Sequence, residues 1–108
     1  MKTIIDYTNI ERDYIYLIRE REFIRCDEPT YKIGKTQQDP PFNRLKQYPK
    51  GSKTILLLGV DDCSRFETKV IKLFNNKYEK MTSYGNEYFK GDINSMINDI
   101  MALRMIDC

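Results

Sequence analysis

The chain has 108 residues, of which 41% are hydrophobic and 31% charged, and its formal net charge is +2. This length fits one domain with one core, and the composition excludes a disordered chain. The longest strongly apolar run, Ile55–Val60, is far shorter than the roughly 20 residues of a membrane-spanning helix. Charges interrupt residues 1–13, so no signal-peptide core is present. We therefore expect an intracellular protein that does not enter a membrane.

Cysteine and histidine usage limits the chemistry that is available. The three cysteines, Cys26, Cys63 and Cys108, are widely spaced and form no C-x-x-C motif, which argues against a disulfide framework and a zinc site. The chain has no histidine. Any catalysis must therefore use tyrosine, lysine, arginine, aspartate, glutamate or asparagine.

Two neighbouring strands are predicted in the first third of the chain. Asp13–Arg19 (DYIYLIR) is rich in aromatic and β-branched residues, which predicts a strand. Its alternation puts Tyr14, Tyr16 and Ile18 on one face and Ile15 and Leu17 on the other. The connector at residues 20–29 predicts a hairpin extension through Phe23 and Ile24. Thr30–Gly34 then predicts an antiparallel partner strand, on which Lys32 points away from the face shared by Tyr31 and Ile33.

A short helix and a buried strand follow. Asp39, followed by two prolines, predicts the start of a helix over residues 41–48, because proline suits the first helical turn. Its apolar positions are Phe42, Leu45 and Tyr48. The continuous apolar run Thr54–Val60 predicts a central strand that is covered on both faces.

The remainder of the chain predicts two longer helices. Ser64 would open the first, whose apolar stripe is Phe66, Val70, Leu73 and Phe74, with Ile71 and Tyr78 at its edge. Tyr88 and Phe89 predict a short extended piece. Asp92 would cap the last helix, whose apolar face is Ile93, Met96, Ile97, Ile100 and Leu103.

This order of elements predicts the fold class. We expect an α/β domain of the α+β type, with a small, mainly antiparallel three-stranded sheet flanked by helices. Residues 1–108 are expected to form a single domain. Cys108 follows the last predicted helix directly, which favours a domain excised from a longer protein.

The segment TYKIGKT, residues 30–36, ends like a phosphate-binding P-loop. A Walker A motif needs a glycine five residues before Gly34, where Pro29 stands, and a loop where this chain predicts a strand. We therefore expect no nucleotide site and no organic cofactor. Residues 30–53 nevertheless hold six basic residues and one acidic residue, Asp39. Such a segment favours a polyanionic partner, and the alternative is a solvated lysine-rich surface.

The order of these features resembles the GIY-YIG nuclease superfamily over about residues 13–90. Two adjacent strands carry Tyr14-Ile15-Tyr16 and Lys32-Ile33-Gly34. They are followed by an arginine on a short helix, a glutamate early in a long helix, and the turn GNEYF at residues 85–89. The segment resembles most the branch found in phages and large DNA viruses, where lysine often replaces the second tyrosine. Here Tyr14 also stands in place of the usual glycine of the first motif.

The resemblance implies a metal-dependent endonuclease that hydrolyses DNA phosphodiester bonds with one Mg²⁺ or Mn²⁺, inside the cytoplasm or nucleus of a virus-infected host. It implies catalytic roles for Tyr16, Lys32, Lys35, Arg44, Glu67 and Asn86, with Glu67 as the metal ligand and Glu87 as an alternative to Asn86. The residues expected to contact DNA are Lys32, Lys35, Arg44, Lys46, Lys50 and Lys53.

Simpler explanations exist for several of these residues. Ser64 and Glu67 have the spacing of a capping box, and Gly34 suits a turn after a strand. Turn chemistry accounts for Asn86. If Tyr16 and Lys32 share a sheet face, the lysine charge is expected to lower the pKa of the phenol. The alternative functions are a catalytically inactive nucleic-acid-binding module and a purely structural domain.

Overall fold

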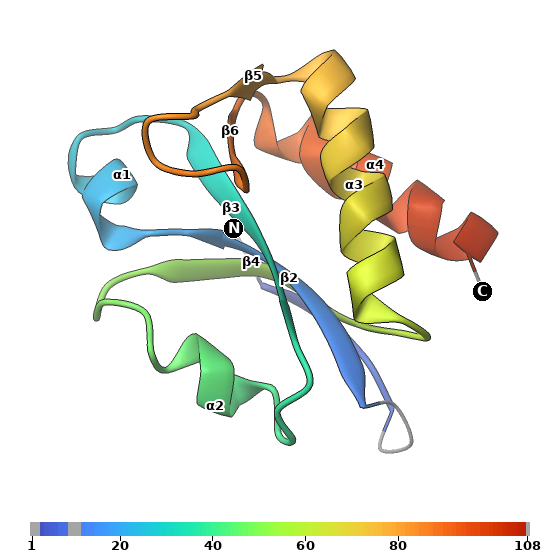
Figure 1. Ribbon diagram of the computed structural model, residues 1–108. Helices are drawn as coiled ribbons and strands as arrows, with labels where there is room; N and C mark the ends of the chain where they lie inside the picture. The colour runs from blue at the N-terminus through green and yellow to red at the C-terminus, as the bar shows by residue number, and fades with distance from the viewer. Residues whose placement is uncertain (1–2, 9–11, 108) are drawn as a thin grey trace.

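The computed structural model describes residues 3–8 and 12–107, which form a six-stranded mixed sheet and four helices (Figure 1). The strands are β1 (Ile4–Asp6), β2 (Asp13–Arg19), β3 (Thr30–Thr36), β4 (Lys53–Val60), β5 (Glu79–Lys80) and β6 (Tyr88–Lys90). The helices are α1 (Arg21–Arg25), α2 (Phe42–Leu45), α3 (Cys63–Lys77) and α4 (Ile93–Asp107). The strand order is β1-β4-β2-β3-β6-β5, with β1 parallel to β4 and the other described pairs antiparallel.

The fold is α+β, but the predicted three-stranded sheet is wrong. The predicted strands correspond to β2, β3 and β4, which form the middle of the sheet. The additional strands β1, β5 and β6 have only two or three residues each, and β6 contains the short extended piece predicted at Tyr88 and Phe89. Such segments are too short to show a hydrophobic alternation, and their pairing depends on neighbours that are distant in sequence. The hairpin extension predicted through Phe23 and Ile24 is also wrong, because these residues lie in α1.

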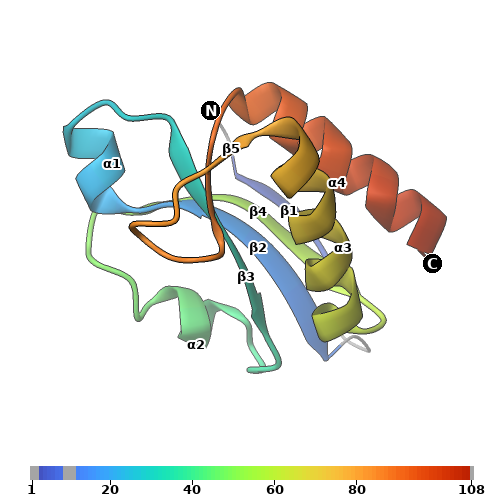
Figure 2. The same cartoon turned by 45° about the horizontal axis from the view of Figure 1, so that its top comes forward.

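The sheet separates two hydrophobic clusters. Helices α3 and α4 cover one face (Figure 2), and there Ile15, Leu17 and Ile33 pack in the larger cluster with Phe66 and Ile100. Helix α2 covers part of the other face. There Tyr14, Tyr16, Ile18 and Leu57 form the smaller cluster, against which Leu45 and Tyr48 pack. The alternation predicted for β2 is therefore confirmed.

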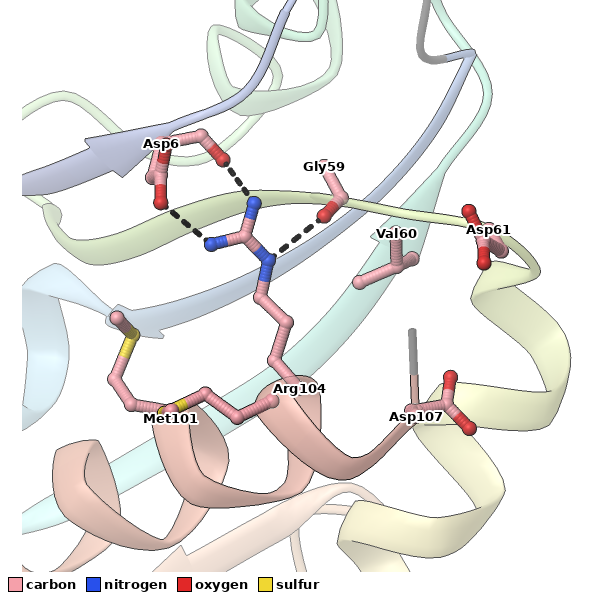
Figure 3. Close-up of a pocket in the computed structure, with 8 residues that line it drawn as sticks. Asp6, Gly59, Val60, Asp61, Met101, Arg104 and Asp107 are labelled. Atoms are coloured by element: carbon pink, nitrogen blue, oxygen red, sulfur yellow. Dashed lines mark hydrogen bonds and ion pairs between the residues drawn. The ribbon is translucent and has the colours of Figure 1, made fainter.

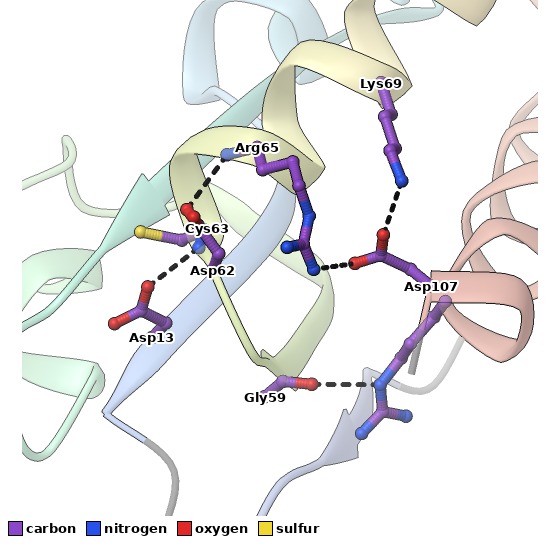
Figure 4. Close-up of polar contacts among 8 residues, drawn as sticks. Asp13, Gly59, Asp62, Cys63, Arg65, Lys69 and Asp107 are labelled. Atoms are coloured by element: carbon purple, nitrogen blue, oxygen red, sulfur yellow. Dashed lines mark hydrogen bonds and ion pairs between the residues drawn. The ribbon is translucent and has the colours of Figure 1, made fainter.

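The residue that caps the start of α3 is Asp62 rather than the predicted Ser64 (Figure 4). The Asp62 carboxylate accepts a hydrogen bond from the Arg65 backbone N–H at 3.1 Å. The neighbouring Cys63 N–H donates to Asp13 Oδ2 at 2.8 Å, and this bond holds the pKa of the Asp13 carboxyl below its usual value. The predicted capping box is therefore wrong, and Glu67 does not serve the helix end. The predicted cap of α4 is confirmed, because Asp92 Oδ2 accepts from the Ser95 N–H at 2.9 Å.

Helix α2 is shorter than predicted. It comprises Phe42–Leu45, and its N-terminal flanking residue Pro41 has no side chain that can cap it. The Asp39 carboxylate instead pairs with Arg12. Lys46 and Tyr48 continue the chain in turns whose backbone N–H groups donate to Phe42 and Leu45. A four-residue helix has little stability of its own, so packing of Leu45 and Tyr48 on the sheet must hold it in place.

Two groups of polar contacts, made by Arg104 and by Asp107, fix the end of α4 against the rest of the fold. Arg104 bridges β1 and β4: its Nη1 lies 2.6 Å from Asp6 Oδ2, its Nη2 donates to Asp6 O at 2.9 Å, and its Nε donates to Gly59 O at 3.0 Å (Figure 3). Asp107 in turn accepts from Arg65 Nη2 at 3.2 Å and Lys69 Nζ at 2.6 Å (Figure 4).

In the described part of the chain, no helix has both the length and the apolarity needed to cross a membrane.

Substitution Arg104→Met is expected to lower the free energy of unfolding by about 1–2 kcal/mol, because three hydrogen bonds are lost while the aliphatic packing is retained. The expected loss of stability is small because the Asp6 side chain is 62% exposed, so solvent screens its ion pair with Arg104. Hydrogen exchange of the β1 amides should accelerate more than that of the β2 amides. Urea unfolding and exchange measurements on both proteins test this. Unchanged β1 protection would show that the strand does not depend on Arg104.

Candidate functional site

A pair of tyrosines lies at the interface between α2 and the sheet. The Oη atoms of Tyr16 on β2 and Tyr48 after α2 are 2.7 Å apart, and the two rings meet edge to face. Tyr16 is only 1% exposed, whereas Tyr48 is half-buried. Burial raises the pKa of the Tyr16 phenol, and the hydrogen bond to Tyr48 raises it further. The expected lowering of this pKa is therefore wrong, because desolvation outweighs the opposing charges of Arg44 and Lys32.

Two cations lie against the ring of Tyr48. Lys32 Nζ is 5.1 Å from its centroid, and the Arg44 guanidinium carbon is 5.0 Å from it. Cation–π attraction of this kind holds both groups close to one point of the surface. The sequence pattern indicates Tyr48 only as an apolar helix position. The available signal was its spacing, four residues after Arg44, which puts both side chains on one side of a helical turn.

Gly34 makes room for the Tyr16 ring. The two residues are direct partners in the β2–β3 register, and β3 continues to Thr36 beyond the predicted strand end. A Cβ atom on Gly34 would overlap the Tyr16 ring. The turn role predicted for this glycine is therefore wrong. Its missing side chain instead lets the Tyr16 ring cross the strand to reach Tyr48.

A buried carboxylate lies where α3 passes β3. Glu67 is 8% exposed, and its Oε1 is 3.5 Å from Lys35 Nζ, which also donates to Ser64 Oγ at 3.1 Å. Burial raises the pKa of Glu67, the nearby Glu87 charge raises it further, and Lys35 opposes both effects. Glu67 is therefore a partly desolvated carboxylate whose charge a cation would stabilise.

Of the two candidates in the turn before β6, Glu87 is the one whose charge acts on Glu67. Its backbone oxygen accepts from the Ile33 N–H at 3.0 Å, so it lies beside β3, adjacent to Gly34. Asn86 is exposed in the same turn.

The remaining basic residues do not form one group. Lys46 and Lys50 are exposed on the segment that joins α2 to β4. Lys53 lies opposite Arg19 in the sheet and lines a cavity with Tyr31 and Ile93, on the face that α4 covers. The structure thus places Lys53 on the other side of the sheet from Tyr48.

The acidic residues fit a metal ion that retains most of its water ligands. Among residues 3–8 and 12–107, no group of three or more histidine, cysteine, aspartate or glutamate side chains is arranged to hold a metal ion. Mg²⁺ typically binds through one or two carboxylates, several waters and a substrate phosphate. Glu67, which lies 3.5 Å from Lys35, and Glu87, whose charge raises the pKa of Glu67, supply that number of carboxylates.

Comparison with known proteins corrects the family assignment. No match to the chain was found among curated proteins or among solved structures. The model of the T5orf172 domain, however, matches residues 13–104. This family is distinct from the GIY-YIG superfamily, so the assignment drawn from the resemblance is wrong. The features that suggested it are individually common. In many folds, packing accounts for tyrosines in strands, turns account for glycines, and helix ends account for glutamates early in a helix.

T5orf172 domains are associated with phages and viruses and are loosely linked to nuclease or DNA-binding function. The match extends over most of the chain, from the first residue of β2 to Arg104 near the end of α4. The chain therefore belongs to the T5orf172 domain family.

Proposed function

We propose that this domain is a metal-dependent endonuclease that hydrolyses DNA phosphodiester bonds with one Mg²⁺ or Mn²⁺. The observation that supports this best is that β3 carries a cation of each half of the site. Lys32 Nζ lies 5.1 Å from the ring centroid of Tyr48, beside Arg44, and Lys35 Nζ lies 3.5 Å from Glu67 Oε1. A cationic cluster suited to phosphate and a buried carboxylate suited to a metal ion therefore both adjoin β3.

The cations would bind the phosphate that is cleaved. The planar guanidinium of Arg44 can donate two parallel hydrogen bonds to phosphate oxygens, and Lys32 adds a second charge beside the same ring. Both would also stabilise the negative charge that develops on the phosphate in the transition state. Lys46 and Lys50 would contact flanking phosphates, which positions DNA without reading its sequence. Lys53 faces away from this cluster and is left out of the proposed interface.

Glu67, with Glu87 nearby, would hold the metal ion. When bound, the metal would act as a Lewis acid that stabilises charge on the leaving oxygen. Lys35 would balance the charge of Glu67 and would lie close to the phosphate. Tyr16 is buried and would act by positioning Tyr48, whose half-buried phenol can form a hydrogen bond to the attacking water. Asn86 would contact the substrate from the exposed turn.

Nicking of supercoiled plasmid in the presence of Mg²⁺ or Mn²⁺ tests the proposal. Wild type should nick the plasmid, and Arg44→Ala should reduce the rate by about 10²–10³, the effect of losing one group that stabilises developing charge. Arg25→Ala, which removes an exposed arginine from another short helix, is the matched control and should nick normally. A wild-type protein that binds DNA but never nicks it would contradict the endonuclease proposal.

The second candidate is a nucleic-acid-binding module without catalysis. The burial of Tyr16 and its raised pKa favour it, because an ionised phenol is then not available to activate water at neutral pH. This candidate predicts DNA binding that weakens steeply with salt and depends on Arg44. Absence of DNA binding even at low salt would exclude both candidates.

A further inference from the structure

A cavity of about 470 Å³ lies between α1 and the segment that leads into β6. Its walls include the rings of Phe23, Tyr84 and Tyr88. The Phe23 ring centroid lies 4.9 Å from that of Tyr84 and 6.0 Å from that of Tyr88, and all three pairs meet edge to face. Tyr84 is 46% exposed, so an aromatic surface is open to solvent at this point. Small-molecule sites have volumes of this size, which is ample for one nucleobase.

The charged groups that line the cavity are carboxylates, beside the hydroxyl of Ser83 and the thiol of Cys26. Glu20 and Glu22 line it, and Tyr88 Oη donates to Glu20 Oε2 at 2.9 Å. Burial and the Glu20 hydrogen bond raise the pKa of Tyr88, so its phenol keeps the proton that orients Glu20. An ionised carboxylate only accepts hydrogen bonds, and it repels phosphate. The cavity is therefore unsuited to the DNA backbone and suited to a flat ligand that carries N–H donors.

The cavity adjoins the proposed phosphate-binding cluster. Lys32 Nζ lies 5.7 Å from the centroid of Tyr88, which lines the cavity, and 5.1 Å from that of Tyr48, which contacts Arg44. One lysine therefore joins the two sites. A nucleotide whose phosphate contacts Lys32 can direct its base toward the aromatic rings.

We propose that this cavity binds an unstacked nucleobase with an exocyclic amino group, from the DNA strand whose phosphate lies at Lys32 and Arg44. The inference rests on the proposed function, since it assumes that the substrate is DNA. Stacking on aromatic side chains contributes about 1–3 kcal/mol per base in single-stranded complexes. Taking a base out of a duplex costs a few kcal/mol, so unpaired DNA is the favoured substrate.

Fluorescence anisotropy with labelled oligonucleotides of one length and charge tests the proposal. The probes are oligo-dC, whose bases carry amino groups, oligo-dT, whose bases do not, and an abasic deoxyribose-phosphate chain. Wild type should bind oligo-dC about 5- to 100-fold more tightly than the abasic chain, with oligo-dT in between. Tyr84→Leu should reduce this ratio to near one without changing affinity for the abasic chain. Tyr84→Phe, which keeps the ring, should retain the ratio.

The results distinguish base binding in the cavity from phosphate binding at Lys32 and Arg44. Arg44→Ala should weaken binding of all three probes and leave the dC-to-abasic ratio unchanged. Equal affinity of wild type for oligo-dC and the abasic chain, or an unchanged ratio in folded Tyr84→Leu, would overturn the base-binding cavity and leave the proposed function intact. Equal affinity for oligo-dC and oligo-dT would overturn the amino-group assignment. Failure to bind any of the probes at low salt would overturn the cavity, whereas the proposed function fails separately, if wild type does not nick the plasmid.

Discussion

Substitution Glu67→Gln should reduce metal-dependent nicking by about 10²–10³ while the protein remains as stable as wild type. The amide keeps the shape of the side chain but removes the charge that would hold the metal ion, and losses of this order follow removal of a group that stabilises developing charge. Stability should be retained because Asp62, and not Glu67, caps α3. The lost contact to Lys35, which is 41% exposed, is worth at most about 1 kcal/mol.

Three measurements complete this test. Plasmid nicking gives the activity, thermal unfolding gives the stability, and titration with Mn²⁺ followed by electron paramagnetic resonance gives metal affinity without relying on activity. Glu79→Gln, which neutralises an exposed glutamate on β5, is the matched control and should behave like wild type. A folded Glu67→Gln protein that nicks DNA at the wild-type rate would show that Glu67 is not the metal ligand.

Substitution Gly34→Ala should destabilise the protein by about 1–3 kcal/mol and disrupt the tyrosine pair, because the added methyl group occupies the space of the Tyr16 ring. Neither residue can move away easily, since both lie inside the paired strands β2 and β3. Urea unfolding measures the loss of stability, and DNA binding at low salt reports the position of Tyr48 and its two cations.

The double variant Gly34→Ala/Tyr16→Leu shows whether the two residues act through each other. Leucine at position 16 vacates the space that the methyl group needs, so the double variant should be more stable than the sum of the single effects allows. Additive effects would mean that Gly34 is required for a reason other than the Tyr16 ring.

The parts of the fold that could be predicted are those whose pattern repeats within one element. Strand β2 alternates over seven residues, and α3 carries a stripe of large apolar side chains over several turns. Helix α1 has no such pattern, since Phe23 is its only buried residue. Strand β1 is three residues long and pairs with β4, which lies about fifty residues further along the chain. Neither element could be read from local sequence.

The same distinction applies to the candidate site. Residue type and order along the chain indicate Lys32, Arg44 and Glu67, but the contacts of these residues depend on segments that are distant in sequence. Tyr48 meets Tyr16 across 32 residues, and Tyr88 meets Glu20 across 68. The direction of the Tyr16 pKa shift depends on burial. That burial comes from the sheet and the α2 segment together, so the sequence of β2 alone does not predict it.

The register of β3 places two kinds of side chain on opposite faces of the sheet. Lys32 and Gly34 face the tyrosine pair, while the alternate residues Tyr31 and Ile33 belong to the larger core cluster. A slip of one residue against β2 would turn Lys32 into the core and Ile33 toward the tyrosines. The slipped state buries a lysine charge and exposes apolar surface, so it is strongly disfavoured. The register that builds the core therefore also builds the cationic cluster, and a chain with β3 out of register would lack the proposed phosphate-binding surface.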